Sequence, residues 1–220
     1  MNPRIEFQTN PIIVLNALHT CGQKILNQQY RPDCCIAATK IMMEVSDYFG
    51  IEARPQVVTT NVYNPIYARL FRENGGPPNS NKQAKEWFDK GAWSVCIGAG
   101  KPKPGHWSGH LVGIFTTEAG KHLIDLTINQ ANRPKKEIGP LESVHFLIPE
   151  EGKRLACPVG NCMVVYDLIN EEEAFPFRSA PDWGGERQKE RNWVVNQMIR
   201  EIKRIDVPSN LPNVSIIVPT

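Results

Sequence analysis

The feature that most constrains the fold is a helical pattern over residues 33–50 that changes directly into a strand pattern. Apolar side chains recur there at steps of three and four, which predicts an amphipathic helix; they are Cys35, Ala38, Met42, Val45 and Phe49. Asp33 is in the position of an N-cap, and Gly50 is where the helix should stop. The next residues, IEARPQVVTTNVY, read as a strand. We therefore expect a helix packed against a sheet.

The remaining patterns extend this arrangement. Residues 11–29 have apolar positions at helical spacing, weakened at Gly22. Short helices are expected at 67–74 and 81–91, and further strands at 92–98, 110–115, 121–128 and 162–169. Leading helices followed by mostly antiparallel strands predict an α+β fold rather than an alternating α/β sheet.

Length and charge narrow the class of protein. The chain has 220 residues, which predicts a single domain over 1–220 with its core at 30–130, a C-terminal helix at about 186–205 and an irregular tail. The net charge of +2 gives no reason to expect nucleic acid or a membrane surface as a partner. No signal peptide pattern is visible, so we expect a cytoplasmic protein, of open oligomeric state.

The six cysteines have irregular spacings, and in a reducing compartment they should be free thiols. The pair in CPVGNC, Cys157 and Cys162, could form a small disulfide or half of a metal site. No second Cys/His pair follows at zinc-site spacing, and Pro158 with Gly160 more simply predicts a turn. We therefore expect no metal and no cofactor.

One combination of residues predicts chemistry. A cysteine in the first turn of a helix gains thiolate character from the helix dipole and the unpaired backbone N–H groups, and Cys35 has that position. It needs a base oriented by a third group. His110 opens a predicted strand, and a tight hairpin near Thr117–Glu118 would set it opposite Asp125; a turn one residue later would make the two diagonal neighbours. A buried Asp125 needs such a partner.

Each of these residues also has a simpler interpretation. A cysteine on an apolar helix face is usually part of the core, a lone histidine at a strand start is usually structural, and Asp125 alone could be a turn or cap residue. Cys34 is an alternative nucleophile, and His106 is an alternative base. Taken together, the three residues and their order favour a Cys35–His110–Asp125 triad.

The segment CIAATKIMMEVSDYFGIEAR resembles the core motif of the transglutaminase-like superfamily, in which the catalytic cysteine opens a helix and a Gly-Ile-Pro-Ala-Arg-like segment follows. Here Gly50, Ile51, Ala53 and Arg54 stand in that register from Cys35, with Glu52 in place of the proline. HLVGIF followed by HLIDLT resembles the family's histidine strand and Asp-x-Thr strand, although Leu111 stands where many members have an aromatic residue. The resemblance covers about 35–130 and implies a papain/transglutaminase-like fold with the nucleophile at a helix N-terminus.

An oxyanion site must also exist, because the tetrahedral intermediate carries a charge that preorganised donors have to meet. The backbone N–H of Cys35 is the first candidate. Gln29, six residues upstream, has the offset at which papain-like enzymes place a glutamine, although it could equally be a polar helix end. Trp107, in GHWSGH, is a candidate for the pocket wall.

These patterns predict a cysteine peptidase or amidase that acts on a peptide or protein amide through a thioester acyl-enzyme. An acyltransferase of transglutaminase or arylamine N-acetyltransferase type shares the same order of catalytic residues. The competing class is a catalytically inactive binding protein of the same fold, which would use the loop at 75–81 or the charged C-terminal helix. Because loops decide specificity, the substrate stays open.

Overall fold

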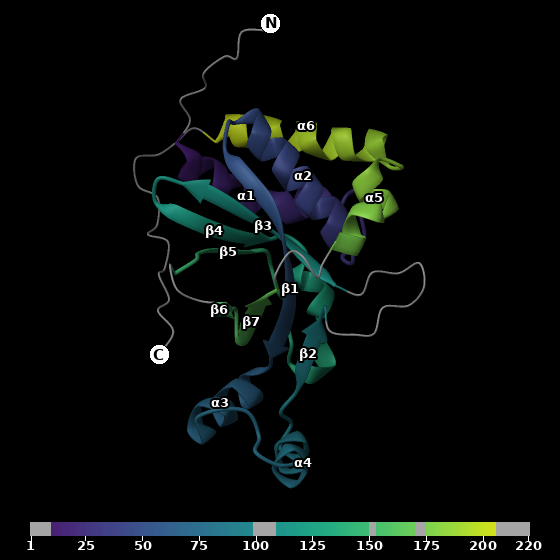
Figure 1. The fold of residues 1–220 in the computed structure, drawn as a ribbon. Coiled ribbons are helices and arrows are strands. Elements are labelled where there is room, and N and C mark those ends of the chain that lie inside the picture. The colour runs from purple at the N-terminus through teal and green to yellow at the C-terminus, as the bar shows by residue number, and fades with distance from the viewer. Residues whose placement is uncertain (1–9, 99–108, 150–152, 170–174, 206–220) are drawn as a thin grey trace, which may run out of the picture.

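The computed structural model describes residues 10–98, 109–149, 153–169 and 175–205. It is a mixed structure of helices and one antiparallel sheet (Figure 1). The sheet has the order β5-β4-β3-β1-β7-β6, and β2 also pairs with β1. The strands are β1 (Glu52–Tyr63), β2 (Ser94–Ile97), β3 (His110–Thr117), β4 (Gly120–Asp125), β5 (Val144–Leu147), β6 (Arg154–Val159) and β7 (Cys162–Leu168).

Three helices lie together on one side of the sheet: α1 (Pro11–Leu26), α2 (Cys35–Tyr48) and α6 (Gln188–Arg204) (Figure 1). Their apolar faces share one buried cluster, to which α6 contributes Val194, Met198 and Ile202 and the sheet contributes Phe115. Gly22 lets α1 approach the sheet closely, because a Cβ there would lie 2.8 Å from a methyl group of Leu126. The glycine that weakens this helix in isolation is therefore required by its packing.

The other face of the sheet encloses a second buried cluster, which includes Val58, Val112, Ile114 and Tyr166. The sheet curls around this cluster until it is nearly closed, and the rings of Phe146 on β5 and Tyr166 on β7 come to 5.9 Å between centroids. The combination of helices with an antiparallel sheet confirms the expected α+β class.

Strand β1 changes its neighbour halfway along. It pairs with β3 up to the Val58–His110 pair and with β2 from the Thr60–Ile97 pair onward. Gly98 stands at this junction with φ +83°, and a Cβ there would lie 2.6 Å from the Val58 carbonyl oxygen and 2.9 Å from the His110 nitrogen. Only glycine fits this conformation and this contact. His110 thus begins its strand at a point where two strands diverge.

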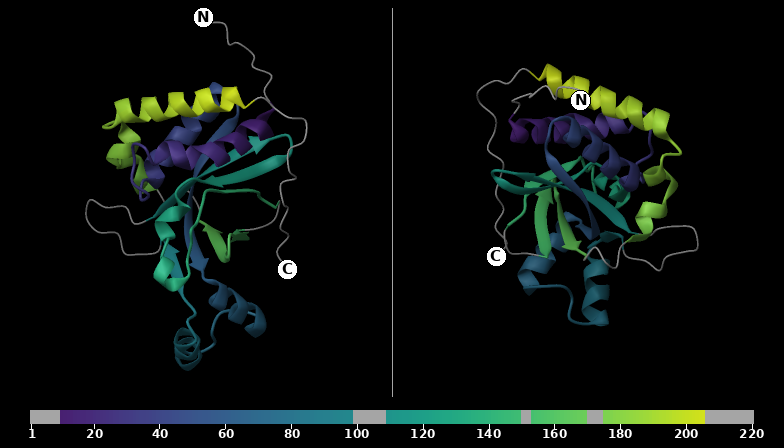
Figure 2. Two further views of the ribbon diagram at one scale, coloured as in Figure 1. Left: turned by 180° about the vertical axis from the view of Figure 1, so that it is seen from behind. Right: turned by 45° about the horizontal axis from the view of Figure 1, so that its top comes forward.

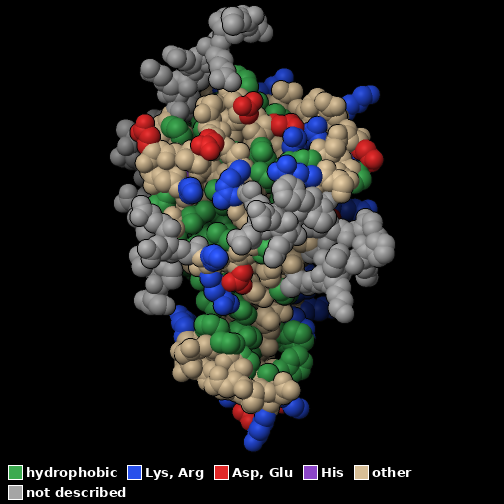
Figure 3. Space-filling model, in the orientation of Figure 1, with side chains coloured by type: hydrophobic (Ala, Val, Ile, Leu, Met, Phe, Trp, Pro, Cys, Tyr) green, Lys and Arg blue, Asp and Glu red, His purple; other side chains and the backbone are tan. Residues whose placement is uncertain are grey.

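Helices α3 (Pro65–Asn74) and α4 (Asn81–Asp89) form an arm between β1 and β2 that extends away from the helical layer (Figure 2). The arm has its own small apolar cluster, with Leu70, Trp87 and Ala92 buried. Hydrophobic side chains also gather on the surface where the arm joins the body (Figure 3). Phe88, which is 52% exposed, packs against Trp93 with the rings tilted and 4.7 Å between their centroids.

Most of the elements expected from the sequence are present with shifted ends. Two details differ around α2, because Cys34 is the N-cap residue and no side chain caps the helix. Asp33 therefore does not cap it, and Cys35 is the first rather than the second helical residue. Gly50 ends the helix as expected, with φ +70°. Strands β5 and β6, the 3-10 helices and the short helix α5 (Pro181–Gly184) were not expected.

The remaining structural expectations concern the cysteines and the membrane. All six cysteines are free thiols, and Cys157 and Cys162 are buried on the two strands of the β6–β7 hairpin, so the small disulfide is not formed. Gly160 adopts a left-handed conformation in the turn between these strands. In the described part of the chain, no helix has the length and apolar character needed to cross a membrane.

Candidate active site

Cys35 occupies the N-terminal end of α2, where the backbone N–H groups of a helix's first turn have no acceptor within the helix. Its side chain is 7% exposed and belongs to a small apolar cluster with Val57 and Leu111. Leu111 is the residue after His110 and lies on the face of β3 that packs against α2. This packing places the start of α2 beside the start of β3.

His110 and Asp125 form a direct hydrogen bond, with 2.8 Å between Nε2 and Oδ2. Both side chains are completely buried. The β3–β4 register pairs Thr117 with Gly120, so Asp125 lies diagonally from His110 rather than directly opposite. This is the second of the two geometries expected from the hairpin, and it brings the two side chains into contact.

The Asp125 carboxylate accepts four hydrogen bonds. His110 and the Tyr166 hydroxyl (3.1 Å) donate to Oδ2. The Thr127 backbone N–H (2.8 Å) and the Thr127 hydroxyl (3.1 Å) donate to Oδ1. Burial alone would raise the pKa of Asp125, but the charge and hydrogen bond of His110, together with the Thr127 and Tyr166 donors, hold it below its usual value. The carboxylate therefore stays ionised and cannot rotate freely.

The electrostatics of His110 connect this carboxylate to the cysteine. Burial alone would lower the pKa of His110. The Asp125 carboxylate outweighs burial, and a hydrogen bond with the Cys35 side chain adds to it, so the pKa of His110 is raised well above its usual range. Because Nε2 is bonded to Asp125, Nδ1 is the ring nitrogen that is left to face Cys35. The three residues of the expected triad are thus in contact in the order Cys35, His110, Asp125.

The neighbouring Cys34 is in a different environment. Its thiol is buried, and burial first, then the charges of Cys35 and Asp182, raise its pKa far above the usual value. It is not among the groups that act on His110, whereas Cys35 is. Because the thiolate is the nucleophilic form, this arrangement favours Cys35 over Cys34 as the reactive thiol.

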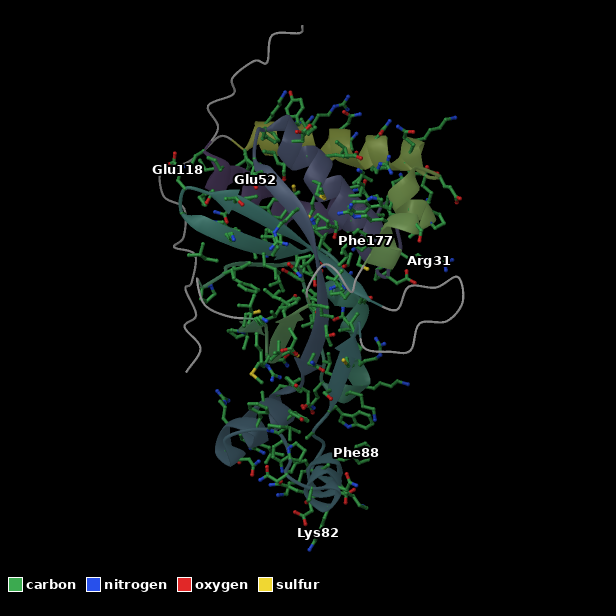
Figure 4. All side chains as sticks on the ribbon, viewed as in Figure 1. Arg31, Glu52, Lys82, Phe88, Glu118 and Phe177 are labelled. Carbon is green, nitrogen blue, oxygen red and sulfur yellow. The ribbon has the colours of Figure 1, made fainter. Side chains whose placement is uncertain are left out.

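A segment from the C-terminal part of the chain covers the start of α2, and no sequence pattern predicted this contact. Phe177, in the 3-10 helix Phe175–Ser179, is buried in the same cluster as Cys35, and Trp183 of α5 packs against it with 5.0 Å between the ring centroids. Figure 4 shows Phe177 and Arg31 near the end of α2 at which Cys35 lies. These aromatic residues form part of the wall of the site.

A cavity of about 500 Å³ opens beside Cys34. Gln29, Asp182 and Arg187 line it together with residues of the turn after α1. The Arg187 guanidinium is fixed there, because it donates a 2.9 Å hydrogen bond to the Gln29 carbonyl oxygen and lies 4.3 Å from the centre of the Tyr30 ring. The cavity therefore has a polar wall beside Cys34, the residue that precedes Cys35.

Of the side chains predicted to form the oxyanion site and the pocket wall, only Gln29 lies in the described part of the chain. The Gln29 side chain is exposed and makes no hydrogen bond with any residue in the described part of the chain, and only its main chain is bonded. Its role as an oxyanion donor stays a prediction. Trp107 and the alternative base His106 lie outside the described residues.

Gln130 is a site residue that the sequence reasoning missed. It lies in the 3-10 helix η1 (Ile128–Ala131), and its Nε2 is 3.2 Å from Nδ1 of His110. It follows the Asp-x-Thr segment by only a few residues, so the continuation of β4 into a short helix was the signal that could have found it. Asp125 and Gln130 thus contact the two different nitrogens of one imidazole ring.

No protein-family model, no curated protein and no solved structure shows a significant match to this chain. Among the described residues, no group of three or more His, Cys, Asp or Glu side chains is arranged to hold a metal ion. The chemistry of the site follows from its own geometry: a thiol at a helix N-terminus lies beside a histidine, and Nε2 of that histidine is bonded to a carboxylate.

Proposed function

We propose that this chain is a cysteine-dependent amidase or peptidase of transglutaminase-like fold, with Cys35 as nucleophile, His110 as general acid and base, and Asp125 as the residue that orients His110. The observation that carries the proposal is the Nε2–Oδ2 hydrogen bond of the buried His110–Asp125 pair, combined with the hydrogen bond of the same imidazole to Cys35. This is the arrangement that nucleophilic catalysis by a thiol requires.

In the proposed acylation step, the Cys35 thiolate attacks an amide carbonyl carbon and a C–S bond forms. The backbone N–H of Cys35, unpaired within α2, donates to the oxyanion. The imidazolium of His110 gives its Nδ1 proton to the leaving nitrogen as the C–N bond breaks, which leaves a thioester on Cys35 and a neutral imidazole.

Deacylation reverses these roles. The neutral His110 takes a proton from water, the resulting hydroxide attacks the thioester carbonyl, and the Cys35 thiolate leaves as the imidazolium re-forms. Asp125 keeps the Nε2 proton in place throughout, since its carboxylate is held by Tyr166 and Thr127. An amine in place of water would give acyl transfer instead of hydrolysis.

The substrate side of the proposal is a polar amide that approaches past Cys34. The cavity there is lined by both arginine and aspartate side chains, a composition that suits the donors and acceptors of a peptide. Hydrolysis is favoured over transfer because water needs no acceptor site.

The test compares the alkylation rates of the six thiols near neutral pH, measured with iodoacetamide and peptide mass spectrometry. We expect Cys35 to react at least about 10-fold faster than the other five, since thiolate character controls the rate. The Cys34→Ser variant should keep this rate and His110→Ala should lose it. Equal rates at all accessible cysteines would rule out the enzyme and favour the binding protein.

A second assay separates hydrolysis from transfer. The protein is incubated with a glutamine peptide and a labelled primary amine, with the Cys35→Ala variant as control. Release of ammonia without incorporation of the amine supports the hydrolase. Cys35-dependent incorporation of the label would replace it with the transglutaminase alternative.

A further inference from the structure

The imidazole of His110 is held at both of its nitrogens by residues from one short stretch of chain. Asp125 bonds Nε2 at 2.8 Å, and the Gln130 amide lies 3.2 Å from Nδ1. Nδ1 is also the nitrogen that is left to bond Cys35, since Asp125 occupies Nε2. Gln130 and the nucleophile therefore meet at the same ring atom.

The backbone that carries Gln130 is fixed on both sides. Ile128 and Ala131, the first and last residues of η1, are completely buried. The Gln130 carbonyl oxygen accepts a 3.0 Å hydrogen bond from the Arg133 guanidinium. Thr127, directly before η1, is bonded to Asp125 through its backbone and its hydroxyl. The position of the Gln130 amide is thus linked to that of the Asp125 carboxylate.

A glutamine amide has a donor end and an acceptor end of nearly the same shape. When His110 is neutral with its proton on Nε2, Nδ1 has a lone pair and accepts from the Gln130 NH₂ group. When His110 is an imidazolium, Nδ1 carries one proton, which the Cys35 sulfur and, after the amide turns over, the Gln130 carbonyl oxygen accept together in a three-centre hydrogen bond. The second bond involves a charged donor, so it is the stronger of the two. Gln130 consequently favours the imidazolium.

We propose that Gln130 is a positioning residue that shifts the Cys35–His110 pair toward the thiolate–imidazolium form. The titratable groups that face His110 within the described residues are Asp125 from β4 and Cys35 from α2. Tyr166 from β7 and Cys157 from β6 act on it through Asp125. Gln130 is a neutral group beside them, and its role in the reaction rests on the proposed function.

The first experiment measures His110 directly, without any activity. The His110 imidazole is titrated by NMR in the Cys35→Ala background, with Gln130→Met and Gln130→Glu added in turn. We expect Gln130→Met to move the titration midpoint to lower pH by about one unit and Gln130→Glu to move it to higher pH by at least as much. If the methionine variant does not fold, Gln130→Leu replaces it.

The matched control is Gln23→Met. Gln23 is also a partly buried glutamine, and its amide donates a 3.0 Å hydrogen bond to the Leu126 carbonyl oxygen near the end of β4. We expect it to leave the His110 midpoint unchanged. The inference is overturned if both Gln130 variants shift the midpoint in the same direction, or by no more than the Gln23 variant, because a purely structural role predicts no opposite shifts.

The second experiment uses the chain with Cys35 intact and measures the alkylation rate of Cys35 as a function of pH. Gln130→Met should slow alkylation about tenfold at pH 6, and the loss should shrink as the pH rises through the His110 midpoint measured by NMR, because the imidazolium is then no longer present to stabilise the thiolate. An equal loss below and above that midpoint contradicts the inference. Slow alkylation of Cys35 in the unmodified chain would instead contradict the proposed function, while the NMR titration still decides the effect of Gln130 on His110.

Discussion

Asp125 is the residue on which most of the buried polar network depends. Its four hydrogen bonds join β3, β7 and the start of η1 to the end of β4. A buried carboxylate with all of its acceptor positions in use is costly to disturb, because removing its charge leaves His110 without a partner in a dry environment. The same contacts that orient His110 in the proposed mechanism are therefore also structural.

We predict that Asp125→Asn lowers the free energy of unfolding by about 3–5 kcal/mol. The loss should be largest between roughly pH 4 and 6.5. The Asp125 contribution exists above its unfolded-state pKa and is lost as pH falls, because its folded-state pKa is lowered. The His110 contribution exists below its unfolded-state pKa and is lost as pH rises through its raised folded-state pKa. Urea unfolding at several pH values measures both the loss of stability at low pH and the loss at high pH.

Asp167→Asn is the control for this prediction. Asp167 pairs with Arg154 at 3.4 Å on the surface, where both side chains are substantially exposed. An exposed ion pair contributes little to stability. We therefore expect Asp167→Asn to change the free energy of unfolding by less than about 1 kcal/mol, with no maximum of this change between pH 4 and 6.5. If Asp125→Asn lowered the free energy of unfolding only as much as the control does, and equally at every pH, the buried His110–Asp125 pair would not stabilise the fold as predicted.

At the scale of elements, the Asn64 side chain joins the base of the arm formed by α3 and α4 to the body of the fold. The Asn64 side chain accepts hydrogen bonds from the backbone N–H groups of Tyr67 (2.9 Å) and Trp93 (3.1 Å). It donates to the carbonyl oxygens of Gly91 (2.9 Å) and Lys136 (3.1 Å). Asn64 thus closes the base of the arm and ties it to the 3-10 helix Pro134–Lys136.

We predict that Asn64→Ala speeds amide hydrogen exchange throughout residues 65–91 by about tenfold or more, since buried partners lose their hydrogen bonds. Exchange in α1, α2 and β3 should change much less, because the arm has its own apolar cluster. Asn74→Ala, at the tip of the arm, serves as the control. Uniform acceleration over the whole chain would show that the arm is not a separate unit.

The sequence predicted elements better than it predicted their contacts. The apolar spacing of 35–49 and the alternation after Gly50 were strong enough to place α2 and β1, and the hairpin symmetry brought His110 to Asp125. Phe177, Trp183 and Gln130 were missed, because no local periodicity shows which distant segment covers a helix end. The cap of α2 was assigned wrongly, because Asp33 has a residue type that favours the N-cap, whereas the helix begins one residue later and Cys34 occupies that position without a side-chain hydrogen bond.

At the scale of the whole molecule, three histidines connect the helical layer to the sheet. His145 on β5 lies 3.1 Å from His122 on β4, and its ring is 5.8 Å from that of His19 on α1. His19 also donates a 2.8 Å hydrogen bond to the Ser143 carbonyl oxygen. Burial, then the neighbouring histidines, lower the pKa of His145 to about 3, and burial lowers that of His122. This contact favours neutral imidazoles.

We predict that acidification weakens the fold through this cluster. A histidine with a lowered folded-state pKa contributes stability above its unfolded-state pKa of roughly 6.5, and the contribution falls as pH drops below that value. His145→Gln should therefore flatten the fall in stability between pH 7 and pH 5, measured by urea unfolding. An equally steep fall in the variant would show that the cluster does not contribute.

The central claim, that Cys35 is an acyl-accepting nucleophile, is tested most directly by trapping the acyl-enzyme. The protein is mixed with an activated ester, 4-nitrophenyl acetate, quenched in acid and analysed by intact and peptide mass spectrometry. We predict one acetyl group on the peptide that contains Cys35, retained in Cys34→Ser and absent in Cys35→Ser and in His110→Ala. An acetyl group that persists in Cys35→Ser, or that spreads over several cysteines, would contradict the account.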